Sequence, residues 1–71
     1  MKDVRYKEYL ISSKFLINQV NYIVTDKNGF DFMLVPKDDG FELTGRDRLK
    51  LNSPSSEIVQ EISNFIFSYN E

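Results

Sequence analysis

Cations alternate along residues 46–51, at Arg46, Arg48 and Lys50. If this segment is extended, its period of two places the three cations on one face and sends Leu49 and Leu51 into the core. Such a ladder could bind phosphates or a partner that carries carboxylates. A solvated edge strand that its charges protect from aggregation explains the pattern with fewer assumptions. We predict an extended segment and keep its three cations as a candidate partner surface.

One aromatic residue, Phe67, stands apart from the apolar stripe of the C-terminal segment. In a helix it would lie about 180° from the stripe that contains Ile58, Ile62 and Tyr69. Aromatic side chains are enriched in binding hot spots, so Phe67 is a candidate anchor for a protein partner or for a second copy of the chain. A singly exposed apolar residue near the chain end is an interpretation of equal weight.

The residue types needed for most catalytic and metal sites are missing. The chain has no Cys and no His, which removes thiol chemistry, the commonest metal ligand and the commonest general base. It also has no Gly-rich phosphate loop and no Gly-x-Ser-x-Gly motif. Asp38, Asp39 and Glu42 flank a glycine turn without the ligand spacing of a calcium loop. We therefore predict no catalytic residue, no metal and no cofactor.

Length and composition indicate one small globular domain over residues 1–71. Chains of this size bury about 60% of their unfolded surface, so their stability is marginal. The net charge of −2 is far from the basic excess typical of nucleic-acid-binding proteins. No apolar run approaches the length of a membrane span or of a signal peptide, so we expect a cytoplasmic protein.

Two turn signals frame a predicted antiparallel meander of three strands, at about residues 20–25, 30–35 and 41–45. Asn28-Gly29 is a strong hairpin signal, because both positions tolerate positive φ. Pro36 should end the second strand, since it has no N–H to donate. Gly40 closes the second turn.

The last segment predicts a helix over about residues 54–69. Ser53 is a good N-cap, and Pro54 loses no useful donor at the first helical position. The apolar residues form one stripe at the spacing i, i+4, i+7, i+8, i+11: Ile58, Ile62, Phe65, Ile66 and Tyr69.

Residues 3–18 fit two patterns. As a helix, they place Tyr6, Tyr9, Leu10, Leu16 and Ile17 on one stripe. As a strand, they place Tyr9, Ile11, Phe15 and Ile17 at even spacing. Because a segment of this length without a turn signal is long for a strand, we predict a helix. The predicted fold class is α+β, a small two-layer domain in which the three-stranded meander packs against an N-terminal and a C-terminal helix.

We predict a non-enzymatic protein-binding module that acts by occluding a partner protein. Its partner is another protein or a second copy of the chain, without membrane contact. In size, composition and element order the chain resembles small phage-encoded inhibitors of bacterial defence systems, which implies an inhibitor or adaptor from a phage or mobile element. The abundance of Lys, Asn, Ile, Phe and Tyr is typical of an AT-rich genome, such as that of a low-GC bacterium or its phage.

Two other functions fit the same sequence. One is a nucleic-acid-binding accessory protein that uses Arg46, Arg48 and Lys50. The other is a structural or self-associating bacterial domain. The sequence contains no motif that decides between these two functions.

Overall fold

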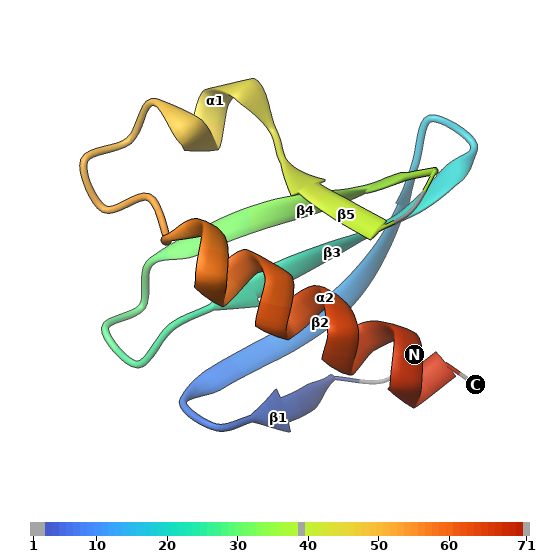
Figure 1. The fold of residues 1–71 in the computed structure, drawn as a ribbon, viewed down its shortest axis with the longest axis horizontal. Coiled ribbons are helices and arrows are strands. Elements are labelled where there is room, and N and C mark those ends of the chain that lie inside the picture. Colours follow the sequence, from blue (N-terminus) through green and yellow to red (C-terminus); the bar gives the residue numbers. More distant parts are fainter. Residues whose placement is uncertain (1–2, 39, 71) are drawn as a thin grey trace.

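A computed structural model describes residues 3–38 and 40–70, which form one antiparallel sheet with a long helix lying across it (Figure 1). The strands are β1 (Val4–Tyr6), β2 (Tyr9–Leu16), β3 (Gln19–Thr25), β4 (Asp31–Lys37) and β5 (Gly40–Leu43). They pair in chain order as a five-stranded meander. A short helix α1 (Gly45–Arg48) and the long helix α2 (Ser56–Asn70) follow. Within the described residues, no helix is both long and apolar enough to cross a membrane.

The prediction of a helix over residues 3–18 is wrong, because these residues form β1 and β2. Two tight turns that the sequence does not signal make the strands possible. Lys7 has a φ of 54° in the first turn, and Ile17 and Asn18 have φ values of 52° and 58° in the second. Positive φ at both central residues is the geometry of a type I′ turn, which usually contains Asn or Gly. The even spacing that favoured a strand was the correct pattern here.

The three predicted strands occur as β3, β4 and β5, but they belong to a five-stranded sheet and the third ends at Leu43. Two further details differ. Pro36 does not end β4 but pairs with Phe41 of β5. Because proline has no N–H, this pair must be of the non-hydrogen-bonded kind, which leaves the ladder intact. In the turn before β4, Gly29 alone takes a positive φ, of 85°, while Asn28 does not. The Asp26 carboxylate stabilises that turn by accepting hydrogen bonds from the N–H groups of Asn28 and Phe30, at 2.8 and 3.0 Å.

The extended segment predicted over residues 46–51 is a helical turn, and its leucines do not enter the core. Leu49 and Leu51 are almost completely exposed, at 88% and 108%. Asp47 points inward instead, and its carboxylate accepts hydrogen bonds from the Met33 N–H at 2.8 Å and the Thr44 hydroxyl at 3.1 Å. Beyond the end of β5, this carboxylate therefore satisfies an edge N–H of β4 that the neighbouring strand does not reach.

Helix α2 is confirmed, but it begins at Ser56. The N-cap is Ser55 rather than Ser53, because the Ser55 hydroxyl accepts the Ile58 N–H at 3.3 Å. Ile62 and Ile66 are fully buried in the predicted stripe. They meet the sheet side chains of the core: Ile11, Tyr22, Val24, Phe32, Leu34 and Leu43.

The β1 edge holds α2 against the sheet through three contacts. The Tyr6 ring stacks on Phe65 with centroids 4.4 Å apart. The Glu61 carboxylate accepts the Tyr6 hydroxyl at 2.8 Å and pairs with the Lys7 ammonium at 2.6 Å. These contacts fix the helix over one face of the sheet.

Candidate functional site

The sheet has two unlike faces, because side chains alternate along each strand and directly paired residues share a face. The face under α2, which we call the helix face, carries every aromatic residue of the strands: Tyr6, Tyr9, Phe15, Tyr22, Phe32 and Phe41. The opposite face has an aliphatic centre of Leu10, Ile23, Met33 and Val35, and we call it the open face. All four of these side chains are partly exposed.

The open face has aliphatic residues in neighbouring positions, with polar Ser12, Asn21 and Thr25 beside them. An antiparallel sheet with one wet face normally alternates apolar and polar residues. Here Tyr22-Ile23-Val24 and Phe32-Met33-Leu34-Val35 are continuous apolar runs, as in strands that are covered on both sides. Among residues 3–38 and 40–70, α2 covers only the helix face, and α1 reaches the other face at its border (Figure 1).

A half-open hollow of about 400 Å³ lies between α1 and the open face. Ile23 and Met33 contribute its apolar side, and Arg46 and Lys50 contribute cations. The structure therefore brings two of the three predicted cations to the aliphatic centre. They reach it from a helical turn and the residues after it, rather than from a strand.

Cations surround the aliphatic centre. Strand register places Arg5, Lys14 and Lys37 on the open face. The predicted cations also lie there: Arg46 and Arg48 in α1, and Lys50 just after it. Among the described residues, the same surface holds three carboxylates, Asp31, Glu42 and Asp47. It thus has three more cations than carboxylates on a chain whose net charge is −2. Counting Asp38, at the adjoining turn, still leaves a positive excess.

Arg48 is held by an ion pair at the border of the open face. Its guanidinium pairs with Glu42 at 2.5 Å, and the Lys37 ammonium contacts the same carboxylate oxygen at 2.7 Å. Hydrogen bonding from Lys37, helped by the charge of Arg48, lowers the pKa of Glu42 below its usual value. Because one carboxylate is shared by two cations, this corner keeps a positive excess. Glu42 is thereby part of an ion-pair cluster.

Asp47 holds α1 beside the open face. Burial raises the pKa of this carboxyl, but hydrogen bonds from the Met33 N–H, Lys50 and Thr44 outweigh burial and lower its pKa overall. The Lys50 ammonium lies 3.0 Å from the Asp47 carboxylate. Of the predicted cations, Arg46 alone makes no ion pair within the described chain, and its side chain is exposed.

Phe67 does not join this surface. It lies on α2, on the helix side of the sheet, where its ring contacts Phe41 at a centroid distance of 5.4 Å. Phe41 in turn meets Tyr22 edge-on at 5.3 Å, so Phe67 is the outer end of an aromatic row that leads into the core. Its exposed fraction is 48%, close to the 50% of Tyr69. The sequence-predicted sites therefore lie on opposite layers of the domain.

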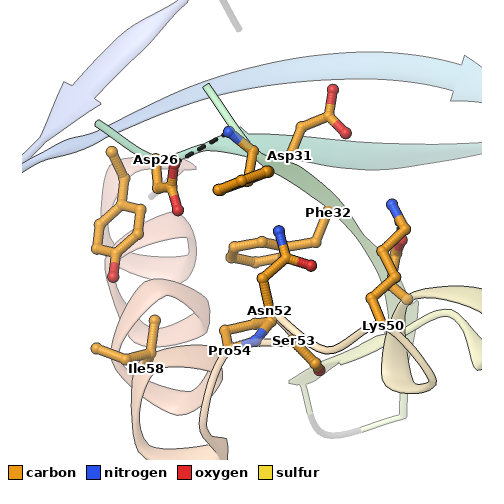
Figure 2. Close-up of a pocket in the computed structure, with 11 residues that line it drawn as sticks. Asp26, Asp31, Phe32, Lys50, Asn52, Ser53, Pro54 and Ile58 are labelled. Atoms are coloured by element: carbon orange, nitrogen blue, oxygen red, sulfur yellow. Dashed lines mark hydrogen bonds and ion pairs between the residues drawn. The ribbon is translucent and has the colours of Figure 1, made fainter. Parts of the chain in front are cut away.

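A smaller cavity of about 100 Å³ lies between the β3–β4 turn and residues 52–54 (Figure 2). The Asp26 carboxylate faces it but is engaged in hydrogen bonds of the turn, and Lys50 stands at the other side of the cavity. Ligand pockets usually enclose about 300–1,000 Å³, so this space is too small to shelter a substrate. No group of three potential metal-ligating side chains occurs in the part of the chain that the structure describes; Asp39 lies outside that part.

Sequence reasoning missed Ile23, Met33 and Val35 because it assigned each strand one buried face and left the other unexamined. The signal was present in the continuous run 32–35, which alternation would have interrupted with a polar residue. The positions of the surrounding cations depended on strand register and on α1, which local patterns do not give.

Comparison with protein-family models, with curated proteins and with solved structures found no match to this chain. The candidate site consequently depends on its own geometry: an aliphatic strip on an uncovered sheet face, bordered by cations.

Proposed function

We propose that this chain is a non-enzymatic protein-binding module that docks a partner protein on the open face. The observation that carries the proposal is the apolar centre of a sheet face that no described helix covers. An apolar centre with a charged border is the usual anatomy of a protein interface. Occluding a partner's surface would be enough for an inhibitor or adaptor from a phage or mobile element, and this requires no catalytic group.

Affinity capture with matched variants tests the proposal. The tagged chain is incubated in a nuclease-treated lysate of a low-GC bacterium, and the bound proteins are identified by mass spectrometry. Met33→Glu places a charge in the aliphatic centre, whereas Phe67→Glu places the same charge on the helix side. We expect one dominant protein to be lost with Met33→Glu and retained with Phe67→Glu, while both variants keep the circular dichroism of the parent chain.

The reverse result would contradict the proposal. Loss of the captured protein with Phe67→Glu alone would move the docking surface to the aromatic row that ends at Phe67. Retention with both variants would show that neither surface is used.

A further inference from the structure

The border of the open face is specific enough to describe the partner, if the proposed function holds. We infer that the partner presents an acidic amphipathic helix to this face, with its apolar side on Ile23 and Met33 and its carboxylates toward the surrounding cations. This would complete a three-layer arrangement in which one helix covers each face of the sheet.

The spacing of the rows that carry the aliphatic residues fits a helix. Ile23 and Met33 pair directly across β3 and β4, and Leu10 and Val35 lie in the rows on either side. Alternate residues of a strand are about 6.6–6.8 Å apart, so the two flanking rows are about 13 Å from each other. A helix with its side chains is about 10–12 Å across, which matches this spacing.

The charges select an acidic helix. Lys14 and Lys37 flank the strip on one side, and Arg46 lies at its α1 end. On the other side, Arg5 shares its row with the Asp31 carboxylate. Six of the eight Lys and Arg residues that the structure describes gather on this surface, whereas the other described residues include two cations and six carboxylates. A partner helix whose carboxylates face Lys14, Lys37 and Arg46 would meet opposite charge there.

The same observations disfavour two other occupants. A second copy docked face to face would bring two positively charged borders together, which costs free energy. Single-stranded nucleic acid would satisfy the cations, but proteins that bind it stack the bases on aromatic side chains. All strand aromatics lie on the helix face, so the strands offer no aromatic ring on the open face for bases to stack on.

Nuclear magnetic resonance titration of the whole chain tests the inference with defined probes. One probe is an 18-residue helical peptide of Leu and Glu with an amphipathic pattern, and its control is the same peptide with Lys in place of Glu. A single-stranded oligothymidylate is the third probe. We expect the acidic peptide to shift the amide signals of Ile23, Met33 and Val35, and to bind at least about tenfold more tightly than the basic peptide.

Two charge reversals sharpen the test. Arg46→Glu should weaken the acidic peptide by about fivefold or more, since it removes one attraction and adds one repulsion. Lys27→Glu, on an exposed cation of the β3–β4 turn away from the open face, should leave its affinity unchanged. Both variants retain the Asp47 hydrogen bonds, so neither should alter the fold.

Four results would overturn the inference. They are equal binding of the acidic and basic peptides, no shift of the open-face signals, tighter binding of the oligothymidylate to the same residues, and concentration-dependent shifts of these residues without any probe. Each leaves the proposed function open to its own test, because loss of the captured protein with Met33→Glu does not depend on the peptide.

Discussion

The two faces of this sheet are made by the same strands but are completed differently. The helix face is aromatic, and Ile62 and Ile66 of α2 seal it with fully buried side chains. The open face is aliphatic at its centre, cationic at its border and only partly buried. The chain itself covers the helix face, which stabilises the fold. We interpret the other as a surface that a partner completes, and the comparison predicts different responses to mutation.

The largest effect should come from the helix face. Ile62→Ala removes a fully buried side chain and should cost about 2–5 kcal/mol, a large part of the stability of so small a domain. Ile23→Ala, the matched change on the open face, should cost only about 1 kcal/mol, because its side chain is already partly in water. Urea unfolding of both variants measures the difference. Equal losses of unfolding free energy in the two variants would mean that Ile23 is part of the core.

An intermediate effect should follow loss of the carboxylate that holds α1. Asp47→Ala leaves the Met33 N–H without its partner and should cost about 1–3 kcal/mol at neutral pH. The pKa of Asp47 is lowered in the folded chain, so its stabilisation is present above the unfolded pKa of about 3.9 and is lost as the pH falls through the folded pKa.

The difference in the free energy of unfolding between the parent chain and Asp47→Ala should therefore become smaller below about pH 4. Urea unfolding at a series of pH values gives this profile. If this difference in unfolding free energy stays constant from neutral to acid pH, the carboxylate acts through packing and not through its charge.

The hairpin turn between β2 and β3 provides a smaller effect, on a segment that α2 does not cover. Ile17 is 91% exposed and takes a positive φ, which strains a β-branched residue. Ile17→Asn should relieve the strain and stabilise the chain by about 1 kcal/mol. Thermal unfolding measures the gain. If the variant also loses the captured partner, this turn belongs to the docking surface.

The smallest effect should come from the ion-pair cluster on the border. Arg48→Gln removes one of two cations that share the Glu42 carboxylate, and both cations are more than half exposed. Solvent screens such pairs, so we expect no measurable change in unfolding temperature. A clear loss would assign Arg48 a structural role in place of a binding role.

Local signals decided how much of this fold could be predicted. The Asn28-Gly29 turn and the stripe from Ile58 to Ile66 are encoded within a few residues, and the structure confirms the hairpin and helix that they indicate. Lys7 and Ile17 take a positive φ that their residue types rarely adopt, so pairing within the sheet must impose these turns. That is why residues 3–18 were assigned to a helix.

The candidate site was only half predictable for a related reason. Arg46, Arg48 and Lys50 stand out in sequence, but the aliphatic strip beside them is assembled from three strands. The position of Phe67 on the helix could be predicted from sequence. Its contact with Phe41 could not, because that contact depends on where β5 lies. Its role as an anchor stays a prediction.

The most direct test of the open face is methyl cross-saturation between the chain and its captured partner. Methyl groups of Met33, Ile23 and Val35 report on the open face, and those of Ile58 and Val59 report on the partly exposed side of α2. Irradiating the partner should saturate the first set and leave the second unchanged. Saturation of Ile58 and Val59 alone would contradict the account and place the partner against the helix.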